Sequence, residues 1–235
     1  MTKSRGAKSQ GSALVEADAV GIGYAEPVCP PVTFRLRPGE VLAVVGANGS
    51  GKSTLLRTAV GLLPALGGRL AVLGADPDGR SARFRTAVAA DLGDDAFFPA
   101  LTVREHLLLT CYGHGVPQPA AVVTDLVQGF GLAEVVHALP SALSSGQRRR
   151  VLLASVFARP RALMILDEPE QRLDAGMRRA LAQRLVAERE RGGAVLLATH
   201  DPTLVRDAAT SAVVLTASRA DVVTASQAAT TMDAL

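Results

Sequence analysis

Residues 46–53 read Gly-Ala-Asn-Gly-Ser-Gly-Lys-Ser and fit the phosphate-loop pattern G-x-x-x-x-G-K-[ST]. Glycines let a backbone wrap closely around an anion, so that successive N–H groups point at phosphate oxygens. The pattern predicts that Lys52 reaches the β- and γ-phosphates of a nucleotide and that the Ser53 hydroxyl ligates Mg²⁺. Beyond Lys3 and Lys8, Lys52 is the only lysine of the chain. The residues expected to contact the nucleotide here are Gly46, Ala47, Asn48, Gly49, Ser50, Gly51, Lys52, Ser53 and Thr54.

A second pair of candidate residues, Asp167 and Glu168, follows four apolar residues at 163–166. The pattern places both acids at the carboxyl end of a buried strand, where α/β sheets bind ligands. Asp167 can hold Mg²⁺, partly through water, and Glu168 can polarise a water for in-line attack on a γ-phosphate. An acidic pair after a strand is often only the start of a loop. Beside a phosphate loop, however, it completes the site of a phosphate-loop NTPase, a class that includes kinases and helicases.

A third motif, Leu-Ser-Ser-Gly-Gln at residues 143–147, precedes the acidic pair and begins a helical pattern that continues to residue 158. Taken alone, Ser144 or Ser145 is typical of a helix N-cap. Together with the other two motifs, the pentapeptide closely resembles the signature of the ATP-binding-cassette (ABC) ATPases, whose usual third residue is glycine where this chain has Ser145. The resemblance extends from about residue 14 to the C-terminus. It implies an ATPase that uses ATP and Mg²⁺ and is coupled to transport.

Further roles follow from the resemblance, residue by residue. Tyr24 matches the aromatic residue that stacks on adenine; the alternative is an ordinary strand tyrosine. Residues 171–174, Gln-Arg-Leu-Asp, match a loop that communicates between subunits and is usually Ser-Ala-Leu-Asp, so that Asp174 is retained. His200, in the segment Leu-Leu-Ala-Thr-His-Asp-Pro, matches the switch histidine that contacts the γ-phosphate. The implied catalytic residues are therefore Glu168, His200 and Lys52.

One position departs from the family. Its members normally have a glutamine before the segment Phe-Phe-Pro-Ala-Leu-Thr-Val, where it contacts Mg²⁺ and senses the membrane partner. Gly93 takes that place in this chain, with Asp94 and Asp95 beside it. A carboxylate is a good Mg²⁺ ligand, which makes Asp94 or Asp95 a candidate replacement. The alternative is that both acids are solvated residues of a turn.

Short apolar runs alternate with helical patterns along the chain, which predicts a parallel sheet covered on both faces. Strands are expected at residues 14–24, 32–36, 41–45, 67–74, 163–166, 194–198 and 212–215, and helices at 54–62, within 101–158 and at 177–191.

The expected fold is α/β. The resemblance specifies a phosphate-loop NTPase with a mostly parallel sheet core, an antiparallel β subdomain and a helical subdomain at roughly residues 100–158. Residues 1–12, rich in Ser, Gly, Lys and Gln, are expected to form a disordered tail, and residues 13–235 a single ABC ATPase domain.

Composition excludes several other classes. A net charge of +3, from 25 basic and 22 acidic residues, is too balanced to indicate a nucleic-acid partner. The run at residues 148–150 is three arginines, interpreted as the solvated face of a helix. Two cysteines, Cys29 and Cys111, cannot form a disulfide framework and favour a reducing compartment. Because the sequence has no uncharged apolar stretch of about 18 residues, any work at a membrane requires another subunit.

In the family, the signature of one subunit completes the ATP site of another. The resemblance therefore implies a head-to-tail dimer, of identical or paralogous subunits, that holds two ATP molecules between Lys52 of one subunit and Ser144, Ser145, Gly146 and Gln147 of the other. Asp174 is also expected to belong to the nucleotide-binding residues. Transmembrane permease subunits would dock on the helical subdomain and hold the chain at the cytoplasmic face of the cell membrane. The alternative is a soluble ABC-type ATPase of complex assembly, such as iron–sulfur cluster assembly. A phosphate-loop kinase would not explain the signature or His200.

Overall fold

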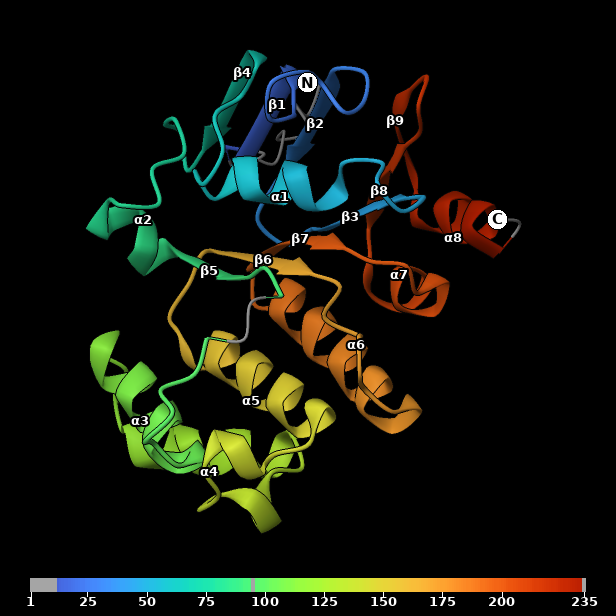
Figure 1. Cartoon of the computed structure of the whole chain (residues 1–235). Coiled ribbons are helices and arrows are strands. Elements are labelled where there is room, and N and C mark those ends of the chain that lie inside the picture. The colour runs from blue at the N-terminus through green and yellow to red at the C-terminus, as the bar shows by residue number, and fades with distance from the viewer. Residues whose placement is uncertain (1–11, 94–95, 234–235) are drawn as a thin grey trace, which may run out of the picture.

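The computed structural model describes residues 12–93 and 96–233. All of the expected tail except Ser12, and the candidate ligands Asp94 and Asp95, lie outside these ranges. Within them, a small antiparallel sheet lies above a larger sheet, with helix α1 (Lys52–Ala59) between the two (Figure 1). The small sheet has the order β2-β1-β4. Its strands are β1 (Val15–Gly21), β2 (Val32–Leu36) and β4 (Gly67–Val72).

The larger sheet has the order β5-β6-β7-β3-β8-β9 in the described part of the chain. All neighbouring strands pair in parallel except β9, which pairs antiparallel with β8. Its strands are β3 (Val41–Gly46), β5 (Val88–Asp91), β6 (Leu163–Asp167), β7 (Ala194–Ala198), β8 (Ser211–Leu215) and β9 (Ala220–Thr224). In register, Asp167 of β6 and Val44 of β3 both pair with Ala198 of β7. The carboxyl ends of these three strands therefore meet at one edge of the sheet.

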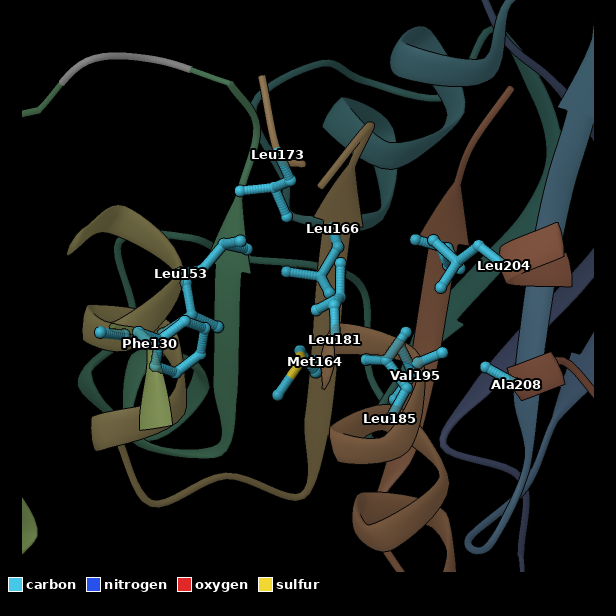
Figure 2. Packing of buried hydrophobic residues seen from close by; sticks show 14 of the residues in the cluster. Phe130, Leu153, Met164, Leu166, Leu173, Leu181, Leu185, Val195, Leu204 and Ala208 are labelled. Carbon is cyan, nitrogen blue, oxygen red and sulfur yellow. The ribbon is translucent and has the colours of Figure 1, made fainter. Parts of the chain in front are cut away.

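Alternate residues of the central strands supply two separate hydrophobic cores. In β6, Leu163 and Ile165 pack toward α1 and the antiparallel sheet, whereas Met164 and Leu166 pack toward the helices on the opposite face. Figure 2 shows Met164 and Leu166 in that second core. Because both faces are covered, β3, β6 and β7 read as continuous apolar runs rather than as alternating patterns.

The helices beneath the larger sheet are α5 (Ser145–Ala158), α6 (Ala175–Glu190) and α7 (Pro202–Ala208) (Figure 1). Helix α8 (Ala225–Asp233) lies beside the sheet and contacts β8, β9 and α7 (Figure 1). Helices α3 (Val103–Gly113) and α4 (Pro119–Gly129) pack against α5. None of the helices in residues 12–93 and 96–233 is long and apolar enough to cross a membrane. The α/β fold, with its parallel core, antiparallel sheet and group of helices, is confirmed.

The structure also contains elements that the sequence did not predict. They are the helices α2 (Ala82–Ala87), α7 and α8 and the strands β5 and β9. Helix α1 starts at Lys52, two residues before the expected start, so that Lys52 and Ser53 belong to its first turn. Strand β5 ends at Asp91, two residues before Gly93.

Candidate nucleotide-binding site

The phosphate loop connects β3 to α1 and surrounds the side chain of Lys52. This side chain is buried, and its Nζ atom donates hydrogen bonds to the carbonyl oxygens of Gly46 at 2.9 Å and Ala47 at 3.0 Å. Burial lowers the pKa of Lys52, and the nearby carboxylates of Glu168, Asp167 and Glu170 oppose that shift. No side chain caps the N-terminus of α1. Its first N–H groups therefore remain available to an anion that Lys52 also attracts.

Asp167 ends β6 and faces the first turn of α1. Burial raises the pKa of Asp167, and a hydrogen bond with the Ser53 side chain partly offsets the increase. The Oδ1 atom of Asp167 is buried and has no hydrogen-bond partner among the described residues. Mg²⁺ prefers oxygen ligands and is commonly held by one or two protein groups together with substrate phosphates. The Ser53 hydroxyl and the Oδ1 atom of Asp167 are suitable protein groups. In the described ranges no cluster of three His, Cys, Asp or Glu residues suggests a metal site made of protein groups alone.

Glu168 is the first residue beyond β6, and its side chain meets His200 from the end of β7. Oε1 of Glu168 lies 3.1 Å from Nε2 of His200. The side-chain amide of Gln171 donates to the other carboxylate oxygen of Glu168. The backbone of Glu168 is left-handed, with φ of 44°, and its N–H donates to the carbonyl oxygen of Ala198 at 2.8 Å. Glu168 is thus held by its backbone and by both carboxylate oxygens.

Glu170 belongs to the same site, although no sequence motif selects it. Its Oε1 atom accepts hydrogen bonds from the Thr199 hydroxyl at 2.5 Å and from the N–H of His200 at 3.0 Å. The side chain is buried, which raises the pKa of Glu170. An acid in a loop pattern usually indicates an exposed residue, so only the packing of the loop against β7 reveals this contact.

A cavity of about 850 Å³ lies between the phosphate loop and the residues that follow β6 and β7. Its lining includes Gly46, Ala47, Glu168, Glu170, Gln171 and His200. One wall is the phosphate loop, and the opposite wall carries carboxylate and imidazole groups. The arrangement can hold a polyphosphate and present a carboxylate to a water molecule next to it.

Two further candidate positions are Tyr24 and the place of the family's glutamine. Tyr24 is 64% exposed, and its hydroxyl accepts a hydrogen bond from Arg57 of α1 at 3.1 Å, which leaves the ring open for stacking. Gly93, at the place of the family's glutamine, has φ of 86° and donates its N–H to Oδ1 of Asp91 at 3.0 Å. A metal contact by Asp94 lies outside the described residues.

The signature motif lies apart from this cavity. Ser144 is the N-cap of α5 and forms a capping box with Gln147. The N–H of Gln147 donates to Oγ of Ser144 at 3.2 Å, and the N–H of Ser144 donates to Oε1 of Gln147 at 2.8 Å. A Cβ on Gly146 would lie 2.8 Å from the carbonyl oxygen of Arg172, so the motif packs closely against the loop before α6. Asp174 is the N-cap of α6, where its Oδ1 atom accepts from the N–H of Met177 at 2.8 Å.

None of residues 144–147 or 174 is among the described residues that line the 850 Å³ cavity. Ser144, Ser145 and Asp174 are instead exposed. Lys52 lies close to the carboxylates of Glu168 and Asp167, and Glu168 contacts His200. The chain presents its signature serines elsewhere on its surface.

Comparisons with known proteins agree with this geometry. Residues 29–171 match the family described as ABC transporter. The cytochrome c biogenesis ATP-binding export protein CcmA of Bordetella parapertussis is 38% identical over 170 residues, which cover 72% of this chain and 76% of the relative. An ATP-binding protein of Salmonella choleraesuis named for 2-aminoethylphosphonate import, PhnT, is 33% identical over 83% of this chain and 54% of its own length. A solved structure of an ATP-binding subunit of an ABC transporter has a TM-score of 0.80 and 28% identity, and the match covers 90% of both chains.

Proposed function

Because this chain belongs to the ABC transporter family as an ATP-binding, ATP-hydrolysing subunit, we propose that it powers a transporter through separate membrane subunits. The observation that supports this proposal best is the convergence of Lys52, Asp167, Glu168 and His200 at one edge of the parallel sheet. Its relatives include ATP-binding proteins named for export and for import, so they differ in the direction of transport and in the transported substrate. The similarity therefore concerns the ATPase and assigns no cargo to this chain.

In the proposed mechanism, the N–H groups of residues 46–53 and the Nζ atom of Lys52 bind the β- and γ-phosphates. Ser53 and Asp167 would hold Mg²⁺, which neutralises phosphate charge when it is bound. Glu168 takes a proton from the attacking water, whose oxygen bonds to the γ-phosphorus while the bond to the β–γ bridging oxygen breaks. His200 orients Glu168 and contacts the γ-phosphate. The products are ADP and inorganic phosphate.

We further propose that two subunits assemble head to tail. Ser144 and Ser145 are exposed at the N-terminus of α5, where the helix dipole and free N–H groups favour an anion. Because these residues lie away from the cavity of their own chain, their anion would be the γ-phosphate held by a partner's Lys52. Gly146, Gln147 and Asp174 complete that contact surface. ATP would then join the subunits, and hydrolysis would release them.

The helical part of the chain is the proposed docking surface for a transmembrane permease, which would hold the chain at the cytoplasmic face of the cell membrane. A groove of about 510 Å³ lies where β5, α3 and α5 meet. Its lining includes the exposed ring of Phe98 and the side chain of Arg159, whose Nε atom has no hydrogen-bond partner in the part of the chain that the structure describes. An apolar segment that carries a carboxylate fits this groove.

The proposal is tested by purifying the affinity-tagged chain from detergent-solubilised membranes of its own organism. We expect it to be recovered with a protein that has several membrane-spanning helices, and the complex to hydrolyse ATP in the presence of Mg²⁺. A Glu168→Gln variant serves as the inactive control. Recovery only in a complex without a membrane-embedded protein would contradict the transport proposal and favour an assembly ATPase.

A further inference from the structure

Arg149, five residues beyond the N-cap of the signature helix, points into the protein rather than into solvent. The expectation that residues 148–150 form a solvated face is therefore wrong for Arg149, which is 6% exposed. Its Nη2 atom donates to the carbonyl oxygens of Asp167 at 3.1 Å and Glu168 at 3.0 Å, and its Nε atom donates to that of Pro169 at 3.3 Å. One guanidinium group thus binds three consecutive carbonyl groups around Glu168.

These three carbonyl groups frame a strained piece of backbone. Glu168 has φ of 44°, a left-handed conformation that is unfavourable for residues with a Cβ atom. Such a conformation persists only where the surroundings hold it in place. Here the carboxylate of Glu168 meets His200, while the carbonyl oxygens of this turn meet Arg149. The arginine therefore holds the turn that directs the carboxylate toward His200.

Asp91 at the end of β5 holds Arg149 in turn. Its Oδ2 atom lies 2.7 Å from Nη1 of Arg149, and the two side chains are 6% and 7% exposed. Its Oδ1 atom accepts from the N–H of Gly93 at 3.0 Å. A buried guanidinium requires an anionic partner and directed acceptors, and this carboxylate supplies both. A chain of contacts thus runs from Gly93 through Asp91 and Arg149 to Glu168.

A small cavity lies next to the contact between Arg149 and the backbone of residues 167–169, and it makes the length of the Arg149 side chain important. Its volume is about 40 Å³, and its lining includes Gly93, Arg149, Asp167 and Glu168. A cavity of this size can hold water. A shorter side chain at position 149 would let water reach the carbonyl groups, and water satisfies them without fixing their direction.

We propose that Arg149 is a positioning residue for Glu168 and that Asp91 orients Arg149. Neither side chain contacts the reacting atoms; both act through the backbone of residues 167–169. The inference rests on the proposed role of Glu168 in hydrolysis. It adds a link, within one chain, between the signature helix, the segment that carries Gly93 and the catalytic carboxylate.

The test compares Arg149→Lys and Asp91→Asn with the wild-type chain. Lysine keeps the charge opposite Asp91 but cannot donate to three carbonyl groups in a planar fork. Asparagine keeps Arg149 but removes the charge that orients it. We expect kcat for ATP hydrolysis to fall about 10- to 100-fold in Arg149→Lys and less in Asp91→Asn, because small errors in placing a catalytic group are costly. The KM for ATP should stay within about twofold, since the residues of the phosphate loop are unchanged.

Arg150→Lys is the matched control. Arg150 is the next residue of the same helix, but its Nη1 atom donates to the carbonyl oxygens of Phe130 and Gly131, away from Glu168. Its kcat should equal that of the wild-type chain. Melting temperatures and ATP affinities of all variants establish that they are folded. If Arg149→Lys does not fold, the kcat and KM of Asp91→Asn decide the question by the same criteria.

A double-mutant cycle separates positioning from general damage. If Arg149 acts through Glu168, then Arg149→Lys should lower residual hydrolysis no further once Glu168→Gln is present. A wild-type kcat in Arg149→Lys, or the same fold loss with and without Glu168→Gln, would overturn the inference. Undiminished turnover in Glu168→Gln alone would instead overturn the proposed role of Glu168, so the two failures are distinguishable.

Discussion

The Nε2 atom of His200 lies 3.1 Å from Oε1 of Glu168. The two residues are 32 positions apart in the sequence, but they follow the ends of neighbouring parallel strands, β6 and β7, in which Asp167 pairs with Ala198. The register brings both strand ends to one edge of the sheet, so that the two side chains start close together. The imidazole and the amide of Gln171 together orient the carboxylate toward the cavity above the phosphate loop.

Glu168→Gln should bind ATP but barely hydrolyse it. The amide keeps the shape of the side chain and cannot accept the proton of the attacking water, so kcat should fall about 10²- to 10⁴-fold. ATP affinity should stay within a few-fold, because Lys52 and the loop are unchanged. Steady-state hydrolysis and equilibrium binding of a fluorescent ATP analogue measure the two effects. Glu190→Gln, an exposed position near the end of α6, is the control, and undiminished turnover in Glu168→Gln would remove that residue from the role of base.

Lys52→Ala should weaken ATP binding. Its ammonium group is held in place by the carbonyl oxygens of Gly46 and Ala47, and its removal takes away a charged hydrogen-bond donor to phosphate. Such a contact contributes about 1.5–3 kcal/mol, so the Kd for ATP should rise about 10- to 100-fold. Isothermal titration calorimetry with ATP measures the change in Kd. An unchanged Kd would show that Lys52 serves only to brace the loop.

Much of this fold could be predicted from the sequence because its central strands are uninterrupted apolar runs. The expected strand at residues 194–198 coincides with β7, and those at 41–45 and 163–166 match β3 and β6 to within one residue. Strand β5 escaped prediction because Val-Ala-Ala-Asp is short and rich in alanine, which has little strand preference. It forms a strand because it pairs with β6. This pairing depends on residues distant in the sequence, so the local sequence pattern does not predict it.

The site likewise contains residues that the sequence predicts and residues that only tertiary packing reveals. The motifs gave Lys52, Asp167, Glu168 and His200, since each follows a recognisable strand. Arg149 and Glu170 were missed because charged residues in helix and loop patterns usually face solvent. Both are buried by packing between segments that are distant in the sequence. The three arginines at 148–150 differ only in the direction of each side chain, which the sequence does not distinguish.

Gly93→Gln, which restores the usual residue of the family, should not raise the activity of this chain. A Cβ at position 93 meets no atom within 4 Å, but the backbone has φ of 86°, which disfavours any residue with a side chain. We expect a loss of about 1–2 kcal/mol in the free energy of unfolding and no gain in kcat. Gly113→Ala is the control, because Gly113 ends α3, also has open space around it and lacks a positive φ. A higher kcat in Gly93→Gln would show that the segment can adopt the family's usual arrangement.

Ser144→Asp should separate the two roles of the signature serine. Aspartate is as good an N-cap as serine, so the melting temperature should stay close to that of the wild type, whereas Ser144→Ala should cost about 1 kcal/mol. The added negative charge opposes binding of a partner's γ-phosphate at the same helix end. In a Glu168→Gln background, we therefore expect ATP-dependent dimerisation, measured by light scattering, to be lost in Ser144→Asp. Normal dimerisation would leave Ser144 with the role of a helix cap alone.

Glu170→Gln should stabilise the chain at neutral and higher pH. Burial raises the pKa of Glu170, the charge of Asp201 adds to this shift, and the hydrogen bonds from Thr199 and from the N–H of His200 act against it. A carboxyl whose pKa is higher in the folded than in the unfolded chain contributes its full stability below the ordinary glutamate pKa of about 4.3. That contribution is lost as the pH rises through the folded value. The wild-type chain therefore bears the cost of a buried carboxylate at higher pH.

Glutamine is neutral throughout this range, and its side-chain oxygen can still accept from Thr199 and His200. The melting temperature of Glu170→Gln should exceed that of the wild type by a few degrees at about pH 8, since 1 kcal/mol corresponds to about 2–4 °C in a chain of this size. The difference should disappear as the pH approaches about 4.3, where the wild-type carboxyl is protonated. Differential scanning calorimetry across this range measures both trends, and Glu190→Gln should show neither. A lower melting temperature for Glu170→Gln at pH 8 would mean that the two hydrogen bonds outweigh burial and that the ionised carboxylate stabilises the site.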